Sequence, residues 1–116
     1  MKIRFLAPAA LALGLSATLP AHADLVIQGR AAQALQCSAL LYMVSDELYS
    51  AGYISKGDLD WAQSAAVVML DHVPGTDEQK AQAMVQRFQK IFATRSLPDL
   101  MKEFDKTAPW CKKNFL

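Results

Sequence analysis

Two cysteines, Cys37 and Cys111, carry the clearest chemistry in this sequence of 116 residues. They do not form a C-x-x-C pair, so their spacing is not that of a thioredoxin-type redox site. Beyond residue 23 the chain has one histidine, His72, and a metal site built on it would need further ligands. We therefore expect no metal site. We interpret Cys37 and Cys111 as partners in a disulfide, the alternative being two free or intermolecular thiols.

The acidic and hydroxyl side chains form no recognisable catalytic group. Asp46 and Glu47 are adjacent on an expected helix and point in different directions, unlike the paired carboxylates of an acid–base site. Asp58, Asp60 and Asp71 do not match the spacing of a calcium loop. No glycine-rich phosphate loop and no nucleophile-elbow serine is present. We expect a protein that is not an enzyme and that carries no cofactor.

A row of tyrosines is the other feature that could take part in binding. Tyr42 and Tyr49, followed by Tyr53, lie roughly above one another on the first expected helix, with Ser38 and Ser45 along the same face. Tyrosine joins a large apolar ring to a polar tip, which suits the rim of a core or a binding surface. Both interpretations stay open. If the tyrosines form a binding surface, they and the loop over residues 53–57 are the candidate contact surface for another protein.

Helices are the elements that must position these side chains. Apolar residues at steps of three and four predict a first helix over residues 30–51. Capping residues predict three more helices, starting near Ser55, Thr76 and Ser96, and the last is expected to be interrupted at residues 107–109. No strand-like alternation appears. We predict an all-α, small four-helix bundle-like domain closed by one disulfide.

The same periodicity predicts which helix faces are buried. On the first helix the expected core stripe is Ala34, Cys37, Leu41, Val44 and Leu48. The second helix carries a stripe from Leu59 to Val73, and the extra apolar residues Trp61 and Val68 predict that it is the most enclosed of the four. On the third helix the expected inner residues are Ala81, Met84, Val85, Phe88, Ile91 and Phe92.

The beginning of the chain has the form of a secretory signal peptide. A positively charged start precedes an apolar run over residues 5–19, and Ala21-His22-Ala23 is a small-x-small cleavage site. The apolar run is shorter than the roughly 20 residues of a spanning helix, so we expect no stable membrane insertion after cleavage. The predicted organisation is a signal peptide over residues 1–23 and one helical domain over residues 24–116. Its predicted location is the periplasm or the exterior, where disulfides form.

Charge is nearly balanced over the whole chain, with a formal net charge of +1, which argues against nucleic acid as a partner. Acidic side chains dominate residues 24–79, whereas basic side chains dominate residues 80–116. One interpretation is that the two halves attract and pack against each other. The other is that the last helices present a basic surface to an acidic partner or to anionic lipid.

The layout resembles two kinds of small periplasmic protein. A signal peptide, a cysteine in the first helix, an alanine-rich second helix and a late cysteine are similar to the helical immunity proteins of bacterial type VI secretion. That resemblance implies a protein-binding module of the inhibitor or immunity type. Size and a single disulfide are also similar to the HdeA-like acid-stress chaperones, which would imply unfolding at low pH and exposure of apolar surface.

The cleavage site gives the first prediction. We expect the exported protein to begin at Asp24, because signal peptidase cleaves after a small-x-small site. The intact mass of protein recovered from the exported fraction measures this directly. A full-length product retained in the membrane would contradict it.

Overall fold

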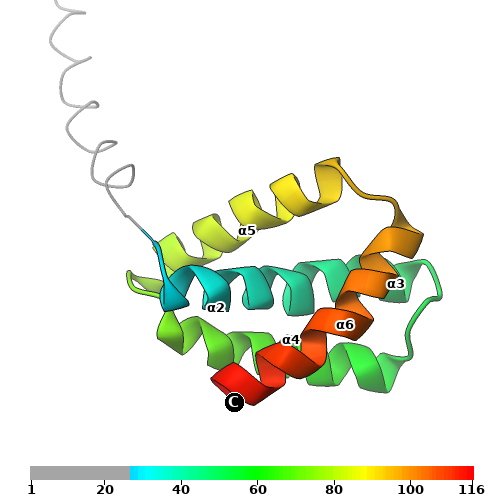
Figure 1. The fold of residues 1–116 in the computed structure, drawn as a ribbon, viewed down its shortest axis with the longest axis horizontal. Helices are drawn as coiled ribbons and strands as arrows, with labels where there is room; N and C mark the ends of the chain where they lie inside the picture. Colours follow the sequence, from blue (N-terminus) through cyan, green and yellow to red (C-terminus); the bar gives the residue numbers. More distant parts are fainter. Residues whose placement is uncertain (1–26) are drawn as a thin grey trace, which may run out of the picture.

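One long helix runs through the middle of the structure and the other helices pack around it (Figure 1). The computed structural model describes residues 27–116, so the predicted signal peptide and its cleavage site lie outside the described residues. The central helix consists of α2 (Arg30–Ala39), a π-helical segment η1 (Leu40–Val44) and α3 (Ser45–Ser50). The predicted helix over residues 30–51 is confirmed, with an unpredicted π-helical turn at its centre.

Three further helices complete the described part, which contains no strand. Helix α4 spans Lys56–Met69 and ends in a short 3₁₀ turn η2 (Leu70–His72), α5 spans Asp77–Ala93, and α6 spans Leu97–Phe115. The all-α prediction is confirmed. In Figure 1, α4, α5 and the central helix lie side by side as a layer, and α6 crosses that layer obliquely. The arrangement therefore departs from a regular bundle of four aligned helices.

Two of the three predicted helix starts have the reciprocal hydrogen bonds that their sequences indicated, whereas at Ser96 only the serine hydroxyl accepts, from the Asp99 amide at 3.3 Å. The Ser55 hydroxyl accepts from the Asp58 amide at 3.1 Å, and the Asp58 carboxylate accepts from the Ser55 amide. Thr76 and Gln79 form the same reciprocal pair. Such caps satisfy amides that have no partner within the helix, which is why they fix where a helix begins.

The predicted interruption of the last helix is wrong. Helix α6 continues without a break through Pro109, although proline lacks an amide hydrogen and normally kinks or ends a helix. The carbonyl oxygen one turn before Pro109 receives no helical hydrogen bond, because proline has no amide hydrogen to donate. Pro109 is exposed, so water can reach that oxygen. Its neighbours Ala108 and Cys111 are buried and hold the helix against the core. Packing and the disulfide therefore outweigh the local cost of the proline.

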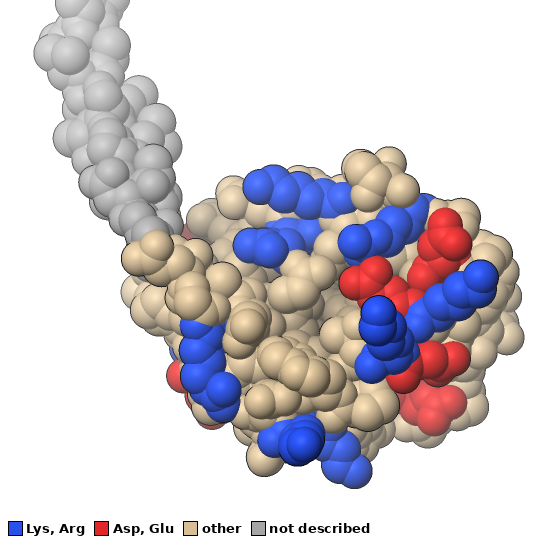
Figure 2. All heavy atoms as spheres, viewed as in Figure 1, with Lys and Arg blue, Asp and Glu red and all other residues tan. Residues whose placement is uncertain are grey.

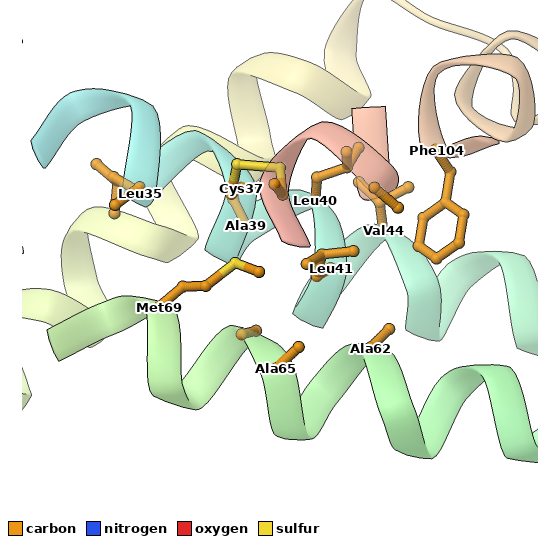
Figure 3. Packing of buried hydrophobic residues seen from close by; sticks show 14 of the residues in the cluster. Leu35, Cys37, Ala39, Leu40, Leu41, Val44, Ala62, Ala65, Met69 and Phe104 are labelled. Carbon is orange, nitrogen blue, oxygen red and sulfur yellow. A yellow bond between two sulfur atoms is a disulfide. The ribbon is translucent and has the colours of Figure 1, made fainter. Parts of the chain in front are cut away.

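The central helix is the most enclosed element, rather than the second helix as the sequence suggested. Its buried apolar side chains are Ala34, Leu35, Cys37, Ala39, Leu40, Leu41, Val44 and Leu48. Helix α4 covers one side with small residues, including Ala62 and Ala65 (Figure 3). Three of its larger apolar residues, Trp61, Val67 and Val68, are exposed. They lie outside the face that α4 packs against the central helix and, to a smaller extent, against α6.

Helix α5 is covered even less than α4. Of its predicted inner residues only Ile91 is buried, and Met84 and Phe88 are partly buried. Val85 and Phe92 are exposed, and so is Ala81. The apolar stripe of α5 is therefore wider than the surface that the central helix covers.

The disulfide between Cys37 and Cys111 is confirmed. It joins the central helix to α6 across a sequence separation of 74 residues, with the two Cα atoms 5.8 Å apart. Both residues are almost completely buried, with exposed fractions of 1% and 0%. Figure 3 shows the bond beside the packed side chains of the central helix.

We expect loss of this bond to reduce the free energy of unfolding by roughly 4–5 kcal/mol, since it closes a long loop in the unfolded chain. A double variant, Cys37→Ala with Cys111→Ala, tests this by urea denaturation beside the oxidised native protein. The oxidised protein in mild reductant without urea is the control, because a buried bond should resist reduction. Equal unfolding midpoints for variant and native protein would contradict the expectation.

Candidate functional site

Tyr42 lies on the π-helical turn of the central helix, and its backbone is held from two directions. Its carbonyl oxygen accepts a hydrogen bond from the Ser45 hydroxyl at 3.0 Å and another from the Gln63 side-chain amide of α4 at 3.2 Å. The Ser45 hydroxyl also contacts the Leu41 carbonyl oxygen. Single π-helical turns inside α-helices are frequent at functional sites, because they change the direction of side chains locally. These contacts fix the backbone from which Tyr42 projects.

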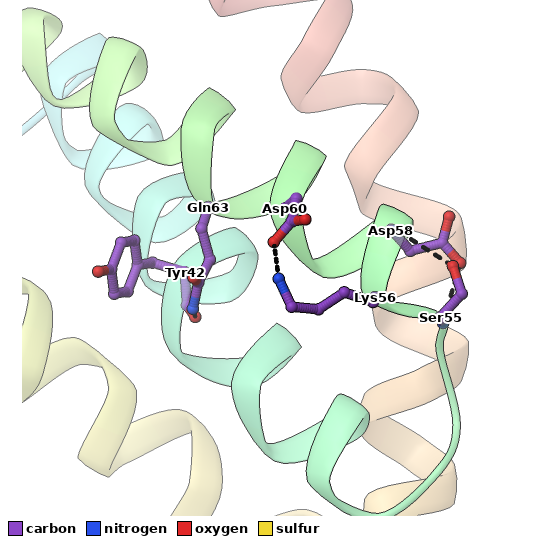
Figure 4. A network of polar contacts seen from close by, with 6 residues as sticks. All are labelled: Tyr42, Ser55, Lys56, Asp58, Asp60 and Gln63. Atoms are coloured by element: carbon purple, nitrogen blue, oxygen red, sulfur yellow. Dashed lines mark hydrogen bonds and ion pairs between the residues drawn. The ribbon is translucent and has the colours of Figure 1, made fainter.

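The three predicted tyrosines are partly exposed, with exposed fractions of 37% for Tyr42, 39% for Tyr49 and 43% for Tyr53. Figure 4 shows the Tyr42 ring pointing away from the central helix, on the same side as Gln63 of α4. Ser38 and Ser45, predicted on the same face, are instead buried. The Ser38 hydroxyl reaches the Ala66 carbonyl oxygen of α4 at 3.3 Å.

Helices α4 and α5 form the walls on either side of Tyr42. Each packs more closely against the central helix than against the other, and Tyr42 and Tyr49 of the central helix remain exposed. Between the two helices is a cavity of about 250 Å³. Its lining comes from the end of α4 with η2 and from the start of α5: Val67, Leu70, Asp71, Asp77, Lys80, Ala81 and Met84.

Helical spacing extends the apolar lining along α5. Val85, Phe88 and Phe92 follow Ala81 at steps of three and four, which places them along the same edge of the helix. The Phe88 and Phe92 rings stack with centroids 5.3 Å apart. We call the surface that carries Tyr42 and Tyr49 and these apolar residues the tyrosine groove. Its residues are Tyr42, Tyr49, Gln63, Val67, Leu70, Ala81, Met84, Val85, Phe88 and Phe92.

Charged side chains lie at the ends of the tyrosine groove. The Lys56 ammonium group donates to the Asp60 carboxylate at 2.7 Å, one turn further along the exposed face of α4 (Figure 4). The hydrogen bond and the charge of Asp60 raise the pKa of Lys56, and nearby Tyr49 adds a smaller increase. At the opposite end, Asp71 and Asp77 line the cavity together with one basic side chain, that of Lys80. The rim is therefore more acidic than basic.

Tyr42 and Tyr49 both lie on the central helix, whereas Tyr53 belongs to the loop after α3. Gly52 of that loop has a positive φ of 82°, a conformation that suits glycine. Sequence reasoning missed Gln63, Val67 and the α5 residues of the groove. The signal available was the width of the apolar stripe on α5, which exceeded what one neighbouring helix can cover.

Metal-ligating side chains form no cluster in the described part of the chain. Residues 27–116 contain no group of three or more His, Cys, Asp or Glu side chains placed to bind a metal ion. His72 instead packs edge-on against Phe115, with ring centroids 5.1 Å apart. Among these residues, no helix has the length and apolar character needed to cross a membrane.

The groove offers contact area and hydrogen-bonding tips rather than reactive groups. Two tyrosine rings and a wall of apolar side chains suit the binding of an apolar surface, and the phenolic hydroxyls can orient it. Comparison with known proteins found no matching family model, no matching curated protein and no matching solved structure.

Proposed function

We propose that this protein is a small exported protein-binding module of the inhibitor or immunity type, and that the tyrosine groove is its contact surface. The observation that carries the proposal is the exposure of Tyr42 and Tyr49 on the central helix. That helix packs against α4, α5 and α6, yet the two tyrosine rings remain exposed to solvent. Tyrosine is one of the residue types that concentrate binding energy at interfaces.

Rigidity supports the same proposal. The disulfide ties α6 to the central helix, and the Gln63 contact holds the backbone of Tyr42 against α4. A surface that is already ordered loses little conformational entropy when a partner binds, so more of the contact energy appears as affinity. The buried disulfide also supports an exported location, since such bonds persist in oxidising compartments.

The shape of the groove favours a helical segment of the partner. Its walls are α4 and α5, helices of 14 and 17 residues. A helix of the partner about 20 Å in length could therefore lie between them, along the central helix. Helix-in-groove recognition uses apolar anchors on one face of the bound helix. The acidic rim formed with Asp60, Asp71 and Asp77 would favour a partner segment that carries lysine or arginine beside those anchors.

The acid-stress chaperone remains the alternative, and the ion pairs count against it. In residues 27–116 the two ion pairs are Lys56–Asp60 and Arg95–Glu103, and both are substantially exposed. Exposed ion pairs contribute little to the free energy of unfolding. The disulfide does not depend on acid at all. We therefore expect the fold to persist where an acid-activated chaperone would unfold.

The pH dependence of folding tests this choice. Circular dichroism and gel filtration from pH 7 to about pH 3 should report a folded helical monomer throughout, since the exposed pairs contribute little. The same measurement on the Cys37→Ala, Cys111→Ala variant is the control, because it removes the acid-independent crosslink. Loss of helical signal near pH 3 with capture of unfolded client protein would favour the chaperone instead.

Alanine at Tyr42 and Tyr49 tests the groove. The double variant should weaken capture of a partner from periplasmic extract by about 10-fold or more, since aromatic anchors dominate interface energy. Its thermal midpoint should stay close to that of the native protein, because both rings are partly exposed.

Trp61→Ala is the matched control for that variant. Trp61 is exposed to a similar extent, 40%, but helical spacing puts it on the edge of α4 away from Gln63. It should leave capture unchanged. A tyrosine variant that melts earlier yet still captures its partner at low temperature would assign the tyrosines to the rim of the core. Equal loss of capture in both variants would remove the groove as the contact surface.

A further inference from the structure

The two oppositely charged halves of the chain do not neutralise each other through ion pairs in the described part. Lys56–Asp60 joins two residues of the acidic half, and Arg95–Glu103 joins two residues of the basic half. Figure 2 shows many lysine and arginine side chains around one face, with the acidic side chains gathered on one side of it. This face is the one crossed by α6. Among residues 27–116, therefore, no ion pair between the two halves offsets the basic charge of the second half.

The end of α6 concentrates this basic character. Residues 106–116 contain Lys106, Lys112 and Lys113 and no aspartate or glutamate. All three lysines are exposed. Because Ala108, Cys111 and Phe115 form the buried face of this segment, helical spacing directs the lysines outward.

Apolar side chains are exposed among these lysines. Trp110 has an exposed fraction of 43% and Leu116 one of 55%, so neither side chain is packed into the apolar core. The Trp110 ring packs edge-on against the buried Phe115, with centroids 5.9 Å apart. Its outer edge therefore remains in solvent beside the lysines.

Arg30, at the start of the central helix, adds a fourth cation to this region. Its guanidinium group lies 4.5 Å from the centroid of the Phe115 ring and donates to the Asn114 carbonyl oxygen. The disulfide at Cys111 attaches the same turn of α6 to the central helix. We call this region the basic tip: Arg30, Lys106, Trp110, Lys112, Lys113 and Leu116.

We propose that the basic tip binds the surface of an anionic membrane, with the lysines at the headgroups and Trp110 and Leu116 at their boundary with the acyl chains. Each lysine or arginine close to an anionic bilayer contributes a favourable electrostatic term. Tryptophan is enriched at the membrane–water boundary, where its ring is apolar and its N–H reaches water. An acidic protein would pair with the lysines, but the lipid surface accounts for the exposed tryptophan and leucine as well.

This binding is peripheral and does not depend on the tyrosine groove. The residues that we assign to the contact belong to the exposed outer surface of α6 and to Arg30. The tip lies on the face of the central helix that carries Cys37, whereas Tyr42 lies where the central helix contacts Gln63 of α4. The two surfaces can therefore be tested separately.

Tryptophan fluorescence gives a direct test. The chain has two tryptophans, so Trp61→Phe leaves Trp110 as the single reporter. Vesicles of phosphatidylcholine with about 30% phosphatidylglycerol should shift its emission to shorter wavelength and protect it from acrylamide. Pure phosphatidylcholine vesicles should not, and salt of about 0.5 M should abolish the effect because it screens surface charge.

Charge reversal at the tip locates the binding site. In the same background, Lys112→Glu with Lys113→Glu should reduce partition onto anionic vesicles by about 10-fold or more, since each basic residue near the surface contributes about 5-fold. Lys80→Glu with Lys90→Glu makes the same change of charge on α5 and should have a much smaller effect. Far-ultraviolet circular dichroism verifies that both variants are folded.

Three outcomes would overturn the proposal. Equal losses in the two charge variants would assign binding to net charge alone. Vesicle binding without a change in Trp110 emission would remove the tip from the contact. Failure to bind anionic vesicles together with salt-sensitive binding to polyglutamate would make the basic tip a site for acidic protein.

Discussion

The bond between Cys37 and Cys111 is the constraint on which the rest of the structure depends. Helix α6 crosses the layer formed by the other helices, and the disulfide fastens the crossing at the buried face of the central helix. A domain of this size buries only a limited core, so a crosslink over a long loop supplies a large share of its net stability. That contribution is what allows tyrosines, tryptophans and valines to remain exposed without loss of the fold.

The starts of the helices could be predicted because their signals are local. Ser55 with Asp58 and Thr76 with Gln79 are three residues apart, and each pair satisfies its own amides whatever the rest of the chain does. Pro109 is the opposite case. Its local preference is to end the helix, but burial of residues on either side keeps α6 continuous. Only the tertiary structure contains that information.

The candidate site could be predicted only in part, for a related reason. Periodicity identifies an apolar face, but it does not say whether a neighbouring element covers that face. Ile91 and Val85 both looked like inner residues of α5, yet Ile91 is buried and Val85 is exposed. The side-chain hydrogen bond from α4 to the Tyr42 carbonyl oxygen is donated by Gln63, which is 21 residues further along the chain. The π-helical turn that it secures has no signature in the spacing of the central helix.

Acidic side chains outnumber basic ones around the tyrosine groove, where Lys56 and Lys80 also lie, and basic ones predominate at the end of α6. Asp60, Asp71 and Asp77 lie around the tyrosine groove, whereas Lys112 and Lys113 lie at the end of α6 on the other face. An anionic bilayer would attract the basic tip and repel the acidic rim, and both forces turn the molecule in the same sense. Bound in that way, the domain would direct its groove away from the lipid, towards proteins in the surrounding compartment. The disulfide at Cys111 would fix that orientation, because it joins the turn of α6 that contacts lipid to the helix that carries Tyr42.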